Sequence, residues 1–488
     1  MKKIILISCI SITPFIFSMP VMAEEKMEFN IYQVMQRVLD RYPLLKTSEL
    51  EVAQAAELKK QVESSLGWQL NSSAGVTHDL TGLGTPSDRM DINSAIGRQL
   101  KSGSTISLSG GYRYEDSSLS INPALPNPAN TTRLDLSYRL PLSQGEGNPL
   151  YSEGLITAES NHKLAKAKQL STRISLAEQV KNIFYATAVT RVRIENAKQA
   201  VKRAKKLELY IDKNVRLGLS EKKDKLQVVA QYNSKLSELS AIRIQWKQQQ
   251  NSLNRLMLEG IGKNVYPSLI SYEKQKSHNL QELIEITKAY HPAIKIAQEQ
   301  LLIAESKINS AIDKKKDSLD LVVSVGSRTS DGTSQLGTVS EKDWAGSISL
   351  EYKHLFDDTG VTSKYKQAQL DKNIALENIT KVNDDIRYTT SGLVAEIKAA
   401  ELAVKTAHKK LKSELLKLKE AEHRFRSGRA NTAQLIQFQN EYSFAELSYQ
   451  NQKIDLNSRI IALKIFSGQF WNKLALESLP SVKHGVKK

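Results

Sequence analysis

The chain has 488 residues, a net charge of +17, eight histidines and a single cysteine. One cysteine excludes an intrachain disulfide framework, and the scattered histidines form no zinc-binding pattern. The excess of basic residues raises nucleic-acid binding as a function class, but lysines such as Lys202, Lys205 and Lys206 have the spacing of a solvated helix face.

The first residues resemble a secretory signal peptide. Lys2 and Lys3 precede an apolar run over residues 4–17, and small residues lead to a predicted cleavage after Ala23. An alternative interpretation makes Cys9 the acylated cysteine of a lipoprotein, but the apolar run before it is short. Cleavage after Ala23 would remove the only cysteine, and export weakens the case for nucleic-acid binding.

The rest of the chain repeats one pattern, which indicates internal duplication. The two copies begin near Phe29 and Leu280, and each opens with a helical segment that carries an X-Pro step, at Pro43 and Pro292. Strand-like text follows in each copy, and then a long helical hairpin. The predicted segments are a signal peptide (1–23), a first helix (24–67), strands (68–142), a helical hairpin (143–260), an equatorial linker (261–279), a second helix (280–318), strands (319–356), a second hairpin (357–472) and a tail (473–488).

The strand regions alternate between apolar and polar residues. Leu134, Leu136 and Tyr138 are separated by Asp135 and Ser137, for example. This alternation is typical of a transmembrane barrel wall, although a soluble sandwich alternates in the same way. Four candidate strands in the first copy and two in the second are too few to close a wide barrel, so several copies would share one. The extra pair in the first copy would either widen the barrel or lie outside it.

The helical regions contain no proline between residues 149 and 267 or between 292 and 480, which favours long uninterrupted helices. Their apolar residues recur at alternating spacings of three and four, as in a coiled coil. Each outgoing helix is predicted to end at a glycine, Gly218 or Gly428, in a left-handed cap, with a return helix directly after it. No segment after the signal has the run of about twenty apolar residues of a membrane-spanning helix.

The order of signal, duplicated halves, strand groups and helical hairpins resembles the TolC-like outer-membrane channel family of Gram-negative bacteria, over nearly the whole mature chain. Its most specific match is the pair of hairpin tips. These tips consist of Arg216, Leu217, Gly218, Leu219 and Ser220 in the first copy and Arg426, Ser427, Gly428, Arg429 and Ala430 in the second.

The resemblance implies a mostly α fold with a β-barrel portion and two internal repeats per chain. Three copies would form one transmembrane barrel of about 12 to 18 strands, continuous with a periplasmic barrel of coiled-coil helices. The tips would dock a periplasmic adaptor protein linked to an inner-membrane pump of the RND or ABC type. The channel would be a passive exit duct for efflux or type I secretion, opened by its inner hairpins, without a cofactor or covalent chemistry.

The periplasmic aperture departs from some family members, which carry rings of acidic residues after the second tip glycine. Here the corresponding positions hold Gln434 and Gln437. Asp224 after the first tip is a third aperture candidate, but an acidic residue in the first helical turn also interacts favourably with the helix dipole.

The sequence raises two other function classes. An enzyme is disfavoured because the sequence has no Walker loop, nucleophile elbow, paired-histidine zinc helix or cysteine pair. His291 and His423 are better explained as a helix-start residue and a solvated residue than as metal ligands. A structural coiled-coil scaffold of the envelope is the alternative; it accounts for the helical stripes, but not for the alternating strands.

Overall fold

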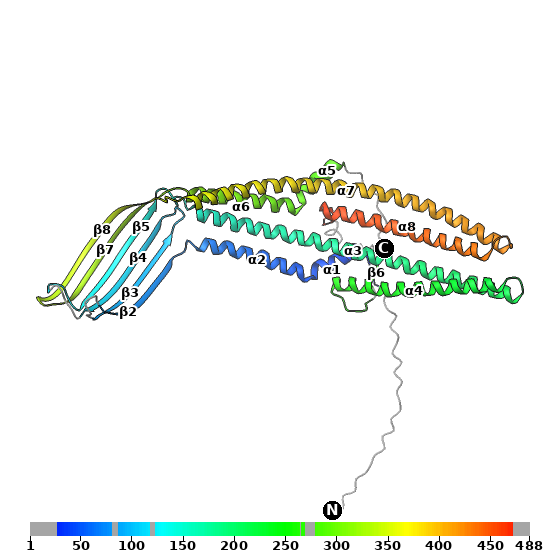
Figure 1. Cartoon of the computed structure of the whole chain (residues 1–488), viewed down its shortest axis with the longest axis horizontal. Helices are drawn as coiled ribbons and strands as arrows, with labels where there is room; N and C mark the ends of the chain where they lie inside the picture. Colours follow the sequence, from blue (N-terminus) through cyan, green and yellow to red (C-terminus); the bar gives the residue numbers. More distant parts are fainter. Residues whose placement is uncertain (1–26, 81–85, 118–122, 264, 269–278, 472–488) are drawn as a thin grey trace, which may run out of the picture. The chain divides into compact units, whose positions relative to one another are not determined.

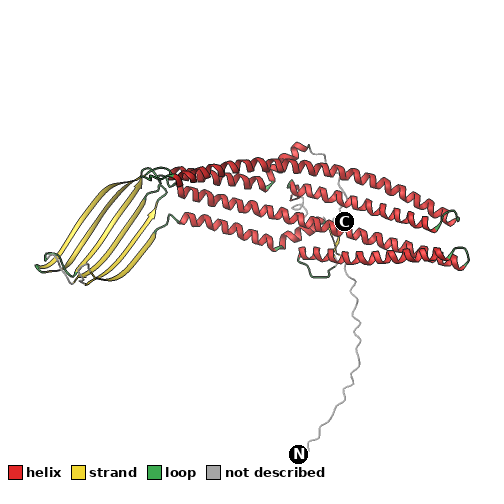
Figure 2. Cartoon of the chain, viewed as in Figure 1, coloured by secondary structure: helices red, strands yellow, loops and turns green. Residues whose placement is uncertain are grey.

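The computed structural model describes residues 27–80, 86–117, 123–263, 265–268 and 279–471. Two compact units are distinguished and are described separately. Unit 1 comprises Met1–Val38, Val180–Glu273 and Leu402–Ser458, and unit 2 comprises Leu39–Gln179, Lys274–Glu401 and Arg459–Lys488. Long helices contribute residues to both units. Figure 1 labels the helices and strands, and Figure 2 colours them by type.

Most of the helices are long. They are α1 (Ile31–Arg41), α2 (Pro43–Ser64), α3 (Pro149–Arg216), α4 (Lys222–Met257), α5 (Leu280–Tyr290), α6 (Pro292–Lys314), α7 (Thr359–Arg426) and α8 (Thr432–Phe466). Both α2 and α6 begin at a proline, whose fixed φ and missing N–H suit the first helical turn. The two outgoing helices α3 and α7 have the same length, 68 residues.

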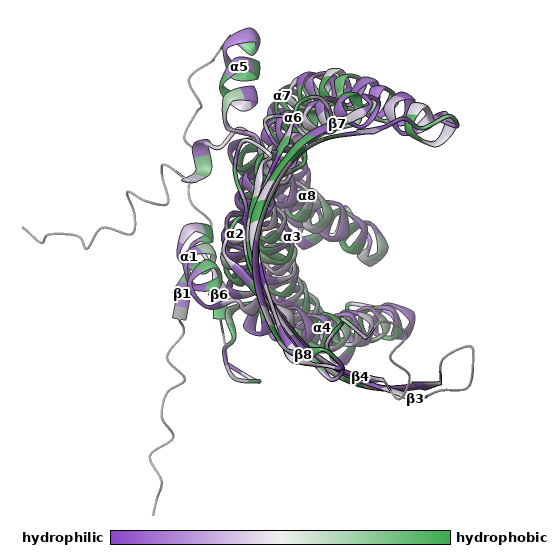
Figure 3. Cartoon of the chain, turned by 90° about the vertical axis from the view of Figure 1, so that its left-hand side faces the viewer, coloured by the Kyte–Doolittle hydropathy of each residue, from purple (hydrophilic) through white to green (hydrophobic). Residues whose placement is uncertain are grey.

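One antiparallel sheet in unit 2 contains the strands of both copies. Its strands are β2 (Gln69–Leu80), β3 (Pro86–Gln99), β4 (Thr105–Ser117), β5 (Ala129–Pro141), β7 (Ser318–Ser334) and β8 (Gly337–Lys353), in that spatial order. The first copy therefore supplies four strands and the second two, as the alternation predicts. The extra pair of the first copy, β2 and β3, continues the same sheet, which curves in the end-on view (Figure 3).

Unit 2 also contains contacts that hold its helices to the base of the sheet. The backbone N–H of Gly145, just before α3, donates to the buried carboxylate of Asp313 at 2.9 Å. Between α3 and α6, the buried Glu299 lies 3.8 Å from the ammonium of Lys163. Buried charges are costly unless they are paired, so these contacts fix how α6 packs near the strands.

Unit 1 contains a two-stranded parallel sheet that the sequence did not single out. Its strands, β1 (Met27–Phe29) and β6 (Val265–Pro267), bring the start of the first copy beside its end. The guanidinium of Arg191 on α3 donates to the carbonyl of Pro267 at 2.8 Å and to the carboxylate of Glu28 at 2.6 Å. These hydrogen bonds connect the sheet of β1 and β6 to α3.

Candidate functional sites

The two hairpin tips have the same backbone geometry. Gly218 and Gly428 both have a φ of +70°, and an added Cβ would meet no atom within 4 Å at either position. The N–H of Leu219 donates to the carbonyl of Asn214, and that of Arg429 to the carbonyl of Arg424, each at 2.8 Å. This is the Schellman arrangement, so the left-handed backbone, and not a lack of space, is what requires glycine.

The return helices begin with matching caps. The carboxylate of Asp224 accepts a hydrogen bond from the N–H of Glu221 at 3.4 Å. In the second copy the amide oxygen of Gln434 accepts from the N–H of Asn431 at 3.4 Å, and the side chain of Asn431 accepts in return at 2.8 Å. Asp224 and Gln434 thus complete capping boxes. Gln437 instead donates to the carboxylate of Glu441 at 2.9 Å.

The tips differ in surface chemistry. Leu217 and Leu219 of the first tip are 60% and 73% exposed. The second tip has Ser427 and Arg429 at the equivalent positions, and both are exposed. The other tip positions are exposed in both copies except Ser220 and Ala430, which are half-buried. The first tip therefore presents two exposed leucines beside one arginine, whereas the second presents two arginines, although their backbones match.

Below the tips the two hairpins share a hydrophobic cluster, called here the tip cluster. It combines side chains from α3, α4, α7 and α8, so each hairpin covers the apolar stripe of the other. Its buried members are Leu207, Ile211, Val228, Leu418, Ala421, Leu435 and Ile436, and Val215, Phe425, Phe438 and Tyr442 pack against them. The coiled-coil spacing predicted most of these positions, but not which helices would meet.

Polar side chains also link the hairpins, and sequence reasoning missed them. Ser443 on α8 accepts from the guanidinium of Arg203 through its hydroxyl, and from the amide of Asn196 through its carbonyl at 3.2 Å. Further towards the tips, Gln231 on α4 donates to the side chain of Asn440 at 3.2 Å. The partners lie more than two hundred residues apart in the sequence, and no local pattern connects them.

Two half-buried carboxylates near the tips, Glu441 and Asp212, are held ionised. The ammonium of Lys417 lies 2.8 Å from Glu441, and its hydrogen bond, with that from Gln437, lowers the pKa of Glu441. In the first hairpin the hydrogen bond from Lys225, 2.7 Å away, is the largest cause of the lowered pKa of Asp212, and Arg216 adds to it. Such ion pairs across a hairpin contribute modestly because water screens them.

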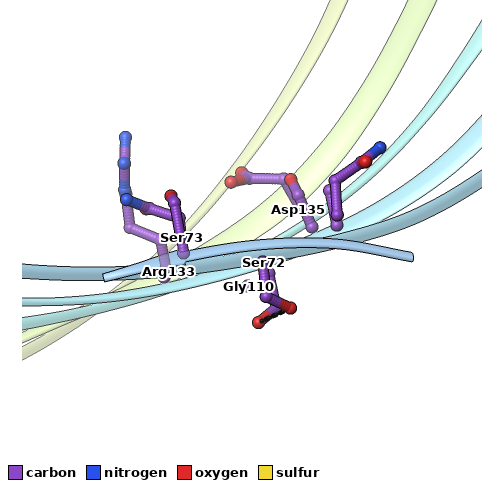
Figure 4. A pocket seen from close by; sticks show the side chains of 11 residues that line it. Ser72, Ser73, Gly110, Arg133 and Asp135 are labelled. Carbon is purple, nitrogen blue, oxygen red and sulfur yellow. Dashed lines mark hydrogen bonds between the residues drawn. The ribbon is translucent and has the colours of Figure 1, made fainter. Parts of the chain in front are cut away.

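The sheet of unit 2 has an apolar face and a polar face, which its register defines directly. The apolar face carries Leu70, Ala74, Val76, Met90, Ile92, Ile96, Ile106, Leu108, Tyr112, Tyr114, Leu134, Leu136, Tyr138, Leu321, Val323, Val325, Trp344, Ile348, Leu350 and Tyr352. Figure 4 shows the alternation, with Ser73, Arg133 and Asp135 projecting to one side of the sheet and Ser72 to the other.

The polar face carries ion pairs and hydroxyl pairs between strands. Arg113 lies 2.7 Å from Asp91, and Arg139 lies 2.9 Å from Asp320 and 2.7 Å from Glu351. Neighbouring serines pair as well, including Ser107 with Ser137 at 2.7 Å. A face with this chemistry requires water, whereas the opposite face has the composition of a surface that contacts lipid or a hydrophobic core.

The described residues contain no group of three or more histidine, cysteine or acidic residues placed to hold a metal ion. None of the helices in the described part of the chain is long and apolar enough to cross a bilayer. His291 caps α6, since its Nδ1 accepts from the N–H of Ala293 at 3.4 Å, and His423 is exposed on α7.

Comparison with known proteins found likeness in structure. No family model matches the chain, and no curated protein matches it in sequence. The outer-membrane channel OprN aligns with 90% of this chain and 90% of its own at a TM-score of 0.68 and 14% identity. The outer-membrane protein VceC of Vibrio cholerae aligns with 90% of this chain and 96% of its own at 0.66 and 15% identity.

The CmeC outer-membrane channel of Campylobacter jejuni also aligns, with 90% of this chain and 86% of its own, at a TM-score of 0.64 and 15% identity. The chain therefore has the fold of these outer-membrane channels, as the resemblance implied: mostly helical, with one sheet portion. At such identities the likeness establishes the fold.

Proposed function

We propose that the protein is the outer-membrane channel of a tripartite efflux or type I secretion system. Three copies join their sheets into one barrel in the outer membrane of a Gram-negative bacterium. Their helices form a duct in the periplasm, and the hairpin tips dock an adaptor protein linked to an inner-membrane pump. The channel does no covalent chemistry; the pump supplies the energy.

The observation that carries this proposal is the two-faced sheet with aromatic residues at two levels. On β8, Tyr352 lies near the helices and Trp344 is eight residues further along. On β4, Tyr114 is eight residues beyond Ile106, the partner of Tyr138. Eight residues of a tilted strand rise about 20 Å along the membrane normal, which is comparable to the apolar band of about 25 Å between the aromatic girdles of such barrels.

The long helices support the second half of the proposal. A helix of 68 residues extends about 100 Å, far beyond the bilayer, so α3 and α7 would reach deep into the periplasm. Their tips present turns of the same backbone geometry with exposed side chains, a suitable surface for docking. The fold of the outer-membrane channels, matched over 90% of the chain, supports the same assignment.

In-cell photocrosslinking tests the docking. A photoreactive amino acid would replace Leu219 or Arg429, both exposed at the tips, with exposed Leu402, remote from the tips in sequence, as a matched control. We expect the tip positions to capture one periplasmic adaptor, identified by mass spectrometry, and the control not to. The class of the adaptor's pump would then identify the cargo as drug, metal or protein. Capture of no periplasmic protein, with normal envelope levels, would instead favour an envelope scaffold.

A further inference from the structure

The six-stranded sheet has two free edges, β2 and β8. Every neighbouring pair within it is antiparallel. Because the number of strands is even, β8 of one copy runs antiparallel to β2 of a second copy placed beside it. Both edges carry exposed apolar residues, including Val76 at 80% and Ile348 at 78% exposure, and exposed strand edges are normally paired or protected.

We propose that all six strands enter the barrel, with β8 of each copy paired to β2 of the next in the register that places Gly75 opposite Ser349. Three copies then give a barrel of about eighteen strands. This inference rests on the proposed trimeric channel and deepens it, because it assigns the β2–β3 pair to the wall and specifies the interface between copies.

The slant of the sheet supports this closure. Starting from Gln69 on β2, the register passes through one residue of each strand and arrives at Ser347 on β8. β8 continues six residues further towards the helices, to Lys353. The helix-side ends of the strands are thus offset by six residues between β2 and β8, over five strand-to-strand steps. This is about 1.2 residues per step, which corresponds to a strand tilt of about 40°. Closed barrels have strand tilts of about 35–45°.

Pairing β8 with β2 of the next copy adds a sixth strand-to-strand step. At about 1.2 residues per step, the register offset between β2 of one copy and β2 of the next is then about seven residues. This register offset must be even, because an odd offset would place the apolar face of one copy beside the polar face of the next. The offset is therefore about six or eight residues. A shift of six would place Asp79 opposite Asp343, and like charges directly opposite each other destabilise a sheet. A shift of eight places Val76 opposite Ile348 and Asp79 opposite Ala345, so eight is the favoured register.

The consequence is a wide exit. At about 4.8 Å between strands and a tilt of about 40°, eighteen strands enclose a cylinder about 36 Å across between backbones, against about 24 Å for twelve. Small residues such as Gly97, Ser107 and Ser324 form one level of the polar face. A polypeptide helix, about 10–12 Å wide with side chains, would pass without contact, so the barrel would not limit the size of the cargo.

Disulfide crosslinking of the full-length protein in outer membranes tests the register. The predicted pair is Gly75→Cys with Ser349→Cys; an added Cβ at Gly75 meets no atom within 4 Å, and both positions lie on the polar face. A register control pairs Gly75→Cys with Ala345→Cys, four residues away. A third variant, Ser109→Cys with Ser349→Cys, reports a narrower barrel in which β4 is the edge and β2–β3 lie outside.

On mild oxidation we expect the first pair alone to give a covalent ladder of dimers and trimers in denaturing gels. Ladders from the Ser109 variant would overturn the proposal in favour of the narrow barrel, and ladders from the Ala345 control would overturn the register. Trimers that are intact on native gels but crosslink at no pair would overturn pairing of these edges. An absence of trimers in all variants and in the unmodified protein would contradict the proposed channel itself.

Discussion

The tip cluster gives the sharpest quantitative prediction. Ile211 is 1% exposed within it, whereas Leu209, on the same helix, is 58% exposed. Replacing Ile211 by alanine removes three buried carbon groups, about 2.4 kcal/mol of transfer free energy, and leaves a cavity, for a total of about 2–5 kcal/mol. Leu209→Ala removes the same number of carbon atoms from a side chain that is already exposed to water, so it should cost less than about 0.5 kcal/mol.

Hydrogen exchange of the amides near the tips measures this difference. If the tips open through the cluster, a loss of about 2–5 kcal/mol accelerates exchange roughly 30- to 3,700-fold in Ile211→Ala, since each 1.4 kcal/mol is tenfold. Leu209→Ala should exchange like the unmodified protein. Equal protection in the two variants would refute the reasoning, because it would mean that the cluster does not hold the hairpins together.

Further predictions concern single positions. Gly428→Val forces a β-branched residue to a φ of +70°, at about 1–3 kcal/mol, so export should fall while trimers on native gels persist; normal export in both Gly428→Val and Gly218→Val would contradict the docking role of the tips. Burial lowers the pKa of His291, so the unfolded state binds the proton first and the melting temperature should fall as pH drops below about 6.5. His291→Asn should keep the cap and lose this slope, and an unchanged slope would mean that another group causes it. The lowered pKa of Glu441 means that its ion pair with Lys417 stabilises the hairpin at pH values above the ordinary carboxyl pKa, and that this stabilisation is lost as pH falls through the lowered pKa. Glu441→Gln should therefore reduce the fall of the melting temperature with pH near about pH 4. The same fall in the variant and the unmodified protein would show that this ion pair does not cause it.

Much of the fold could be predicted because its signals are local. A glycine followed by a new amphipathic run identified Gly218 and Gly428, and alternation identified the strands. The capping boxes at Asp224 and Gln434 were also readable, since an acid or amide three residues after a polar cap is a local pattern. The aperture role of these two residues and of Gln437 remains a prediction, and their caps supply a structural reason for the residue types.

The remaining features depend on contacts distant in sequence. Nothing around Arg203 indicates that it meets Ser443, and nothing around Gln231 indicates Asn440, because packing of one hairpin against another selects these partners. The place of β2 and β3 was also undecided, since alternation defines the faces of a strand but not its neighbours. The register of Gly97 with Ser107 joins the pair to β4 in one sheet, and its place in the barrel wall remains a proposal.

Single-channel recording of the purified full-length trimer in a planar lipid bilayer tests the central claim most directly. The account predicts discrete, long-lived conductance steps from an inserted trimer, because the polar face of the sheet lines a water-filled pore. Trimers that insert stably but conduct no ions, even at high voltage, would contradict the channel and leave the scaffold as the better explanation.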